Sequence, residues 1–361
     1  SLFELTTGSE NTAFGQQALR NTTTASFNTA IGRAAMNDNT TGANNTAVGQ
    51  NALADNTTAS NNTAVGYQSL RLNTTGTNLV AIGANALDAN TTGNNNTAVG
   101  EDALTDNTTG VDNTGFGVAA LFDNTTGVHN AGFGKDALRE NVSGNYNVAL
   151  GSSAMNSCGN GSNNVAVGYS SLFNNTGSNN TTAGYESMRA NTSGGSNSAF
   201  GTEALKANTT GQSLVGIGFR ALTKNTTADY NIAIGSGAMH ENQTGTDNTA
   251  IGRAALYNNG NGSNTAVGSL ALYLNTSGFE NTAVGRSALQ NNTTGNSVTA
   301  VGRSALANNT TGSYNVAIGK GSLDANTTAS NNTGVGYDAL GANTTGTENT
   351  AVGSLAGDAL T

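Results

Sequence analysis

Adjacent pairs of apolar residues, one small and one large, recur along the whole chain with polar stretches between them. In the copy at 45–61, NTAVGQNALADNTTASN, the pairs are Ala47-Val48 and Ala52-Leu53. Neighbouring side chains of a strand point to opposite faces, so such a pair predicts a strand buried on both sides, with the larger residue toward the core. One helical turn is the alternative for the second pair, because so short a segment cannot separate the two periods. We favour the strand, since Thr and Val lead into it and no helix cap is evident.

The pattern returns at every seventeenth position. A glycine follows the first pair 21 times, and only the steps ending at Gly184 and Gly268 are one residue shorter. A strict period is the signature of stacked units that bury their faces against one another. The sequence therefore predicts an all-β fold, a β-solenoid (β-roll-like) of about 21 coils with about 17 residues per coil. We number each copy so that the glycine is position 5; the first six are Gly15, Gly32, Gly49, Gly66, Gly83 and Gly100.

The repeat predicts one continuous domain over 1–353. Residues 354–361 are expected to form an irregular end, a cap or the start of another module, because the pattern slips after Gly353. The chain starts at Ser1 without a methionine, as expected of a processed or excised piece of a longer protein.

Four further positions have structural interpretations. Positions 4 and 9 carry large apolar residues and are predicted to form the core; position 9 includes Leu53, Leu70 and Leu87. The glycine at position 5 indicates positive φ or very close approach to another chain. Position 12 is Asn in nearly every copy, and stacked Asn side chains can form an amide ladder or cap the backbone of the turn. Its members include Asn56, Asn73 and Asn90.

Small residues suggest that the chain associates with copies of itself. Position 3 is almost always Ala or Gly and position 5 is always Gly, which predicts a face made for close contact. Each coil also has only two sizeable apolar side chains to offset the entropy of ordering its entire backbone. We therefore expect a homo-oligomer, either a trimer or a filament.

Composition narrows the classes of partner. The formal net charge is −9 and the 13 Lys and Arg residues are scattered, which argues against binding to nucleic acid or anionic membranes. The sequence contains no run of about 20 apolar residues, so no membrane insertion is predicted. Cys158 is the only cysteine, so no intrachain disulfide can form.

No catalytic, cofactor or metal site is expected. His129 and His240 occupy different positions of the repeat, six to seven coils apart, and the acidic residues at position 11 are too irregular for a calcium repeat. Asn-Thr-Thr is formally a glycosylation sequon, although we favour the interpretation that these residues simply form the corner. Some copies carry an aromatic residue at position 6, as a candidate for contacts with surfaces or glycans; because these residues are intermittent, we favour packing or neutral variation. They include Tyr67, Tyr169, Tyr185 and Tyr337.

The core motif resembles that of a known family. NTAVG, with variants NVAVG at 164–168 and NVAIG at 315–319, is similar to the motif of trimeric autotransporter adhesin heads. The longer unit NTAVGxxALxxNTTG resembles repeats of phage and bacterial proteins with tail-fibre-type domains. The resemblance covers 11–353 and implies a homotrimeric β-roll that binds surfaces outside the cell. Adhesin-head coils are shorter, and the additional residues here fall in the Asn-Thr-Thr-Gly corner.

These observations predict a structural fibre or filament protein, adhesin-like or tail-fibre-like, on a cell or virion surface. It would act through self-assembly and attachment, with surface glycans or a receptor as further partners. An ice-binding solenoid is the alternative, because Thr recurs at positions 2, 13 and 14. A polysaccharide-acting enzyme is a third alternative, which the lack of insertions and charged clefts disfavours.

Overall fold

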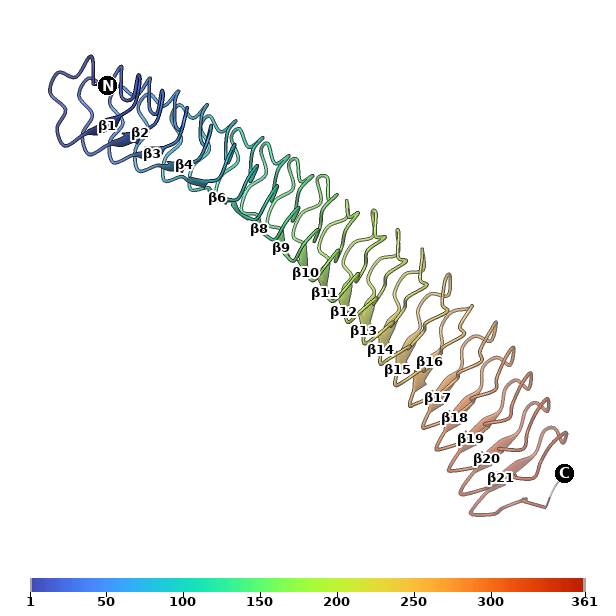
Figure 1. The fold of residues 1–361 in the computed structure, drawn as a ribbon. Helices are drawn as coiled ribbons and strands as arrows, with labels where there is room; N and C mark the ends of the chain where they lie inside the picture. Colours follow the sequence, from blue (N-terminus) through green and yellow to red (C-terminus); the bar gives the residue numbers. More distant parts are fainter. Residues whose placement is uncertain (1, 360–361) are drawn as a thin grey trace. The chain divides into compact units, whose positions relative to one another are not determined.

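The computed structural model describes residues 2–359, which fall into two compact units that divide between Asn180 and Thr181. We call them the N-terminal unit and the C-terminal unit. Each is a parallel β-solenoid with one short strand per coil (Figure 1). The predicted domain boundary at 353 stays a prediction, and Ser1 and 360–361 lie outside the described residues.

The strands occupy positions 2–4 of the repeat. Those of the N-terminal unit are β1 (Thr12–Phe14), β2 (Thr29–Ile31), β3 (Thr46–Val48), β4 (Thr63–Val65), β5 (Val80–Ile82), β6 (Thr97–Val99), β7 (Thr114–Phe116), β8 (Ala131–Phe133), β9 (Val148–Leu150) and β10 (Val165–Val167). Those of the C-terminal unit are β11 (Thr181–Ala183), β12 (Ser198–Phe200), β13 (Val215–Ile217), β14 (Ile232–Ile234), β15 (Thr249–Ile251), β16 (Thr265–Val267), β17 (Thr282–Val284), β18 (Thr299–Val301), β19 (Val316–Ile318), β20 (Thr333–Val335) and β21 (Thr350–Val352).

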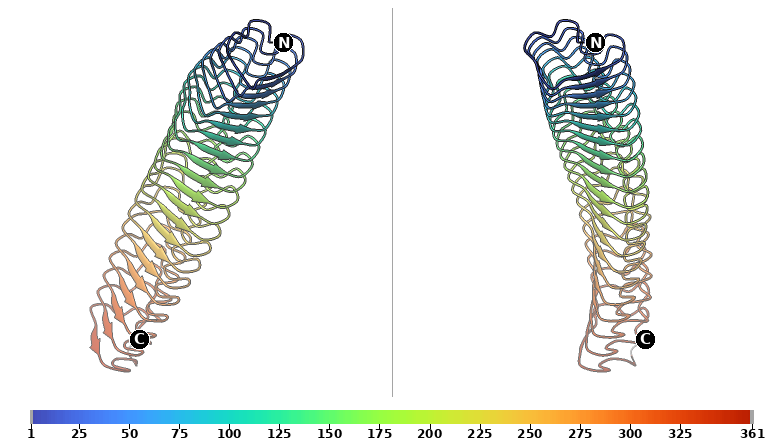
Figure 2. Two further views of the ribbon diagram at one scale, coloured as in Figure 1. Left: turned by 90° about the vertical axis from the view of Figure 1, so that its left-hand side faces the viewer. Right: turned by 60° about the vertical axis from the view of Figure 1, so that its left-hand side comes forward.

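Successive strands pair in parallel, position for position. In β3 and β4, for example, Ala47 lies opposite Ala64 and Val48 opposite Val65. Within each unit the strands therefore form one row on one side of the coils, and turns make up the other sides (Figure 2). Residues 2–359 contain no helix. The predicted fold class, an all-β solenoid with about 17 residues per coil, is confirmed, and its strands are parallel.

The second apolar pair forms neither a strand nor a helical turn. Positions 6–11 are turns in which positions 7 and 9 have positive φ, as in Asn51 (φ 58°) and Leu53 (φ 52°). Their backbone groups still bond to adjacent coils, from Asn51 N to Arg33 O (3.0 Å) and from Leu53 N to Ser69 O (2.9 Å). Because the left-handed residue breaks the strand alternation, Ala52 and Leu53 both face the interior and are fully buried.

The apolar pair at positions 3 and 4 faces the opposite way from the prediction, with its small residue inward and its large residue outward. Ala47 at position 3 is fully buried, whereas Ile82 and Phe116 at position 4 are 41% and 53% exposed. The interior has room only for the small residue, because position 3 faces the position-9 leucine of the preceding coil. A Cβ placed on Gly115 would already lie 3.4 Å from Cγ of Leu104. The prediction that positions 4 and 9 together form the core is wrong for position 4.

The invariant glycine serves contacts within the chain. Gly117 has φ +138°, and a Cβ there would lie 2.6 Å from the carbonyl carbon and oxygen of Gly134. Such overlap with backbone excludes every other residue. The close approach is thus to the next coil, and position 3 is buried, so positions 3 and 5 form no free face for sister chains. The predicted assembly face is wrong in its residues.

Candidate functional site

The position-12 asparagines form a buried ladder along one corner. Nδ2 of Asn73 donates to Oδ1 of Asn56 (3.2 Å), and Nδ2 of Asn90 donates to Oδ1 of Asn73 (2.9 Å). Each also donates to the position-15 carbonyl of its own coil, as Asn56 does to Ala59 O at 3.0 Å. Both interpretations of this position from the sequence, ladder and cap, are therefore confirmed. The predicted residues Leu53, Leu70 and Leu87 lie inside the same coils, fully buried.

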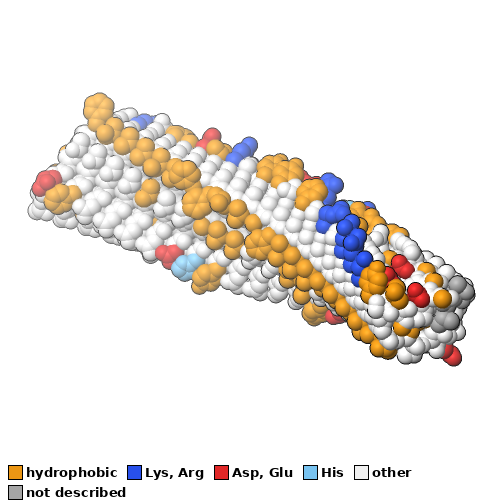
Figure 3. Space-filling model, turned by 90° about the horizontal axis from the view of Figure 1, so that it is seen from below, with side chains coloured by type: hydrophobic (Ala, Val, Ile, Leu, Met, Phe, Trp, Pro, Cys, Tyr) orange, Lys and Arg blue, Asp and Glu red, His pale blue; other side chains and the backbone are white. Residues whose placement is uncertain are grey.

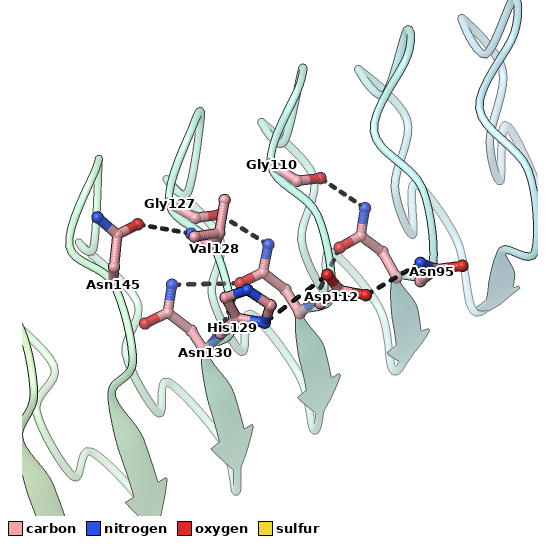
Figure 4. A network of polar contacts seen from close by, with 10 residues as sticks. Asn95, Gly110, Asp112, Gly127, Val128, His129, Asn130 and Asn145 are labelled. Atoms are coloured by element: carbon pink, nitrogen blue, oxygen red, sulfur yellow. Dashed lines mark hydrogen bonds and ion pairs between the residues drawn. The ribbon is translucent and has the colours of Figure 1, made fainter.

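A second ladder at position 1 was not predicted. The backbone N–H of Asn45 donates to Oδ1 of Asn28 (2.9 Å), and Nδ2 of Asn45 donates to Ala59 O (2.9 Å). Ala59 O therefore accepts from the asparagines at positions 1 and 12, which satisfies a buried carbonyl that faces no strand. Figure 4 shows the bonds that the position-1 asparagines donate to the carbonyls of Gly110 and Gly127. The signal was present in the sequence, because position 1 is Asn in most copies.

Threonine hydroxyls at position 13 belong to the scaffold as well. Oγ1 of Thr57 donates to Thr74 O (3.2 Å), and Oγ1 of Thr91 donates to Thr108 O (3.1 Å). The Thr side chains at position 14 are exposed, and those at position 2 lie on the outer face of the strands. Of the three predicted Thr ranks, one is thus engaged in holding coils together.

The outer face of each sheet is an unpartnered apolar row. Positions 2 and 4 point outward together, so a row of Thr or Val runs beside a row of Val, Ile, Leu and Phe. Figure 3 shows hydrophobic side chains following one another along this face. Exposed members at position 4 include Ile31, Ile82, Phe116, Phe133, Leu150, Val167, Phe200, Ile217, Ile251, Val284 and Ile318.

The aromatic residues at position 6 border this row. Tyr67, Tyr169, Tyr185 and Tyr337 each have about half of their surface exposed. Their side chains are therefore placed where a ligand or another chain could reach them. That they contact glycans stays a prediction.

A row of contacts runs from coil to coil at position 17 of the N-terminal unit. Nδ2 of Asn95 donates to Oδ1 of Asp112 (3.0 Å), and Oδ2 of Asp112 lies 3.7 Å from Nδ1 of His129 (Figure 4). The His129 ring stacks on Tyr146 with centroids 5.0 Å apart. Each residue is one coil beyond the last, so the repeat itself brings these side chains together.

A row of carboxylates lies at position 11 of the N-terminal unit, with Asp106, Asp123 and Glu140 in successive coils. Partial burial raises the pKa of Asp106 and of Asp123, and repulsion adds to it: from Asp88 on Asp106, and from Asp106 on Asp123. Attraction to Arg139 opposes the raised pKa of Asp123 only in part.

The C-terminal unit contains a different cluster, a notch between three coils. A cavity of about 260 Å³ is lined by residues that include Phe219, Gly237, His240, Arg253 and Tyr257. His240 stacks on Tyr257 with centroids 5.0 Å apart, and its Nδ1 lies 2.8 Å from Oε1 of Glu241. His129 and His240 thus lie in separate surroundings in different units, and the polar partner described for each ring is a carboxylate, Asp112 for His129 and Glu241 for His240.

Cys158 is a corner residue that replaces Asn at position 12. Its Sγ lies 3.7 Å from Oδ1 of Asn141, where another coil would place the ladder amide. Burial raises the pKa of the thiol to about 12. A thiol with that pKa is a poor nucleophile, because the thiolate is the reactive form.

Residues 2–359 hold no group of three or more His, Cys, Asp or Glu side chains that could bind a metal ion. Within the same residues, no helix is long and apolar enough to cross a membrane. No protein-family model and no curated protein matches the chain.

Proposed function

We propose that this chain is a structural fibre protein of a cell or virion surface, which associates with copies of itself and attaches to surfaces. The observation that carries the proposal is the outward row of large apolar side chains at position 4, such as Phe116 and Leu150. At roughly 60 Å² of open apolar area per coil, ten coils expose roughly 600 Å², as much as the largest apolar patches of monomeric proteins. Such a face favours a permanent partner.

A second copy of this chain is the partner that fits best. Apolar side chains recur once per coil, about every 4.8 Å, and a sister chain presents the same spacing along its whole length. Together with the neighbouring Thr row at position 2, the area that one unit could bury comes near the roughly 800 Å² per partner that a stable interface buries. The resemblance to trimeric adhesin heads and tail-fibre repeats supports a trimer or a filament.

Sedimentation velocity tests the proposal. The full chain should sediment as a trimer or larger species, and Phe116→Ser with Leu150→Ser should shift it toward the monomer without lowering its urea midpoint. Thr126→Ala with Thr294→Ala is the matched control, since both hydroxyls are exposed at position 14. A monomeric full chain at all concentrations would refute self-assembly.

Ice binding is a second candidate, because the Thr row at position 2 lies on a regular outer sheet face. Val80, Val148 and Val165 interrupt that row, and position 13 is engaged in the scaffold. A thermal-hysteresis assay separates the two functions: ice shaping by the full chain, lost in Thr46→Tyr with Thr63→Tyr, would favour ice binding.

A further inference from the structure

The notch of the C-terminal unit exists because one coil carries small side chains where its neighbours carry large ones. Positions 6 and 7 are Ser236-Gly237, between Phe219-Arg220 and Arg253-Ala254. A Cβ on Gly237 would lie 3.6 Å from a ring carbon of Tyr257, so the space opens directly onto that ring. The notch is therefore a built recess in an otherwise regular surface.

The walls of the notch are held rigidly. Tyr257 is fixed between His240 and Tyr273, whose ring centroids lie 5.0 and 5.2 Å from its own. On the opposite side, the Arg220 guanidinium lies over Phe219 at 5.0 Å, and its Nε bonds to Oε2 of Glu203 at 2.6 Å. About half of Phe219 is exposed, so the part of its ring that Arg220 does not cover remains open to a ligand.

A row of cations continues from the notch along position 6. Arg253, Arg286, Arg303 and Lys320 are all exposed, and among the described residues none has a carboxylate partner. From 219 to 307, positions 6, 7 and 10 carry no Asp or Glu. Three of these cations stand in successive coils, about 4.8 Å apart, where like charges repel unless an anion lies between them. Figure 3 shows basic side chains gathered beside the apolar row.

We propose that this face of the C-terminal unit binds an acidic polysaccharide. One sugar ring occupies the notch against Phe219, and the carboxylates of following residues pair with Arg253, Arg286, Arg303 and Lys320. This proposal rests on the proposed attachment to surfaces, and it specifies the chemistry of the surface that is bound. It is independent of the apolar row that mediates self-association.

The aromatic arrangement favours a polysaccharide over single-stranded nucleic acid. Proteins that bind single strands present successive open rings, on which successive bases stack. Here His240, Tyr257 and Tyr273 stack on one another, and the cation row contains no further aromatic residue until Tyr337. The row presents guanidinium groups with the hydroxyls of Ser287 and Ser304 beside them, which suits carboxylate and hydroxyl partners.

Calorimetric titration of the full chain with polygalacturonate tests the proposal. We expect binding that weakens with added salt, and no binding of neutral dextran. Arg286→Gln with Arg303→Gln and Lys320→Gln should weaken binding at least tenfold. Gly237→Gln should weaken it by filling the notch, and Gln68, with φ 56°, shows that position 7 accepts this residue.

The matched control is Arg33→Gln, which removes a cation from the same coil position in the N-terminal unit and should leave binding unchanged. Equal loss with Arg33→Gln, or no binding of polygalacturonate by the full chain, would overturn the site. Tighter binding of oligo-dT, sensitive to the same variants, would overturn the polysaccharide in favour of nucleic acid. Sedimentation of the same samples separates the two proposals: a monomer that binds polygalacturonate refutes self-assembly alone, and an oligomer that does not bind it refutes this site alone.

Discussion

The two units have the same interior and different exteriors. Asn107 in the N-terminal unit and Asn292 in the C-terminal unit make the same three ladder bonds, with distances of 2.8–3.2 Å. Outside, the N-terminal unit has 5 cations against 12 carboxylates (net −7), and the C-terminal unit has 8 against 10 (net −2). Positions that bond coil to coil vary little, with Thr22 and Cys158 as exceptions at position 12, whereas outward positions vary freely. Both proposed functions therefore rest on outward positions.

Charges are also arranged differently in the two units. Carboxylates of the N-terminal unit follow one another at position 11. In the C-terminal unit, Lys206 bridges Glu186 and Glu203 at 2.7 and 2.8 Å, and Arg220 bonds Glu203 in turn. Alternating signs stabilise stacked coils, whereas rows of one sign remain available for a partner. The cation row from Arg253 to Lys320 has no carboxylate partner among the described residues. It is a row of one sign, as the acidic row at position 11 is in the N-terminal unit.

The largest effect should come from position 5, and it should be equal in both units. Gly117→Ala and Gly285→Ala each place a Cβ 2.5–2.6 Å from the next backbone at φ above +130°. Left-handed strain and overpacking together should cost about 3–5 kcal/mol. Urea denaturation measures the loss, and Thr126→Ala and Thr294→Ala serve as controls. A unit that tolerates the change would show that the two interiors are not equivalent.

The second-largest effect on stability should come from the buried asparagine ladder at position 12. Asn107→Ala and Asn292→Ala each remove three bonds. The position-15 carbonyl keeps its bond from position 1, but a buried amide oxygen of one adjacent ladder asparagine and a buried amide N–H of the other lose their partners, which should cost about 2–4 kcal/mol. Hydrogen–deuterium exchange on the full chain should show faster exchange of the altered coil and its two neighbours. Exchange that rises evenly across both units would contradict a local role for each ladder step.

Cys158 offers a smaller, opposite effect. Cys158→Asn would supply the amide that position 12 normally holds and donate to Oδ1 of Asn141. We expect a gain of about 0.5–1 kcal/mol, and Cys158→Ala should give none. Equal urea midpoints for the Asn and Ala variants would show that this corner, SCGNG at 157–161, does not accept the ladder geometry.

The smallest effects concern pH, and they should have opposite signs in the two units. The raised pKa of Asp106 and Asp123 means that folding is favoured below their unfolded pKa, an advantage lost as pH rises through the folded value. Asp106→Asn with Asp123→Asn should therefore raise the urea midpoint at pH 7, by about a few tenths of a kcal/mol, and have no effect near pH 3.

In the C-terminal unit, hydrogen bonds from Lys206 and Arg220 lower the pKa of Glu203, and a bond from Lys224 lowers that of Glu241. Their contribution is present at pH 7 and lost as pH falls through the folded pKa. Glu203→Gln with Glu241→Gln should lower the urea midpoint at pH 7 and leave it unchanged at low pH. The same sign for both pairs of variants would contradict the charge contrast between the units.

Part of the sidedness could have been read from the sequence. Position 3 varies only among small residues, from Gly115 to Thr182, whereas position 4 varies from Ala183 to Phe14. Such tolerance of volume is typical of an outward position, because a packed interior does not accept it. The notch and the cation row are not repeated in other coils, so no periodic pattern predicts them.

The sequence by itself determined the period, the solenoid, the leucine interior and the asparagine ladder, because each coil must bond to an identical neighbour at the same position. Only the tertiary structure decided that Gly117 meets the next coil rather than another chain, and it gave the reason why the smaller member of each Ala–Val pair faces inward. Alternation along a strand separates two faces without saying which one is inside. That choice depends on the left-handed turn at positions 7 and 9 and on the narrow interior it encloses.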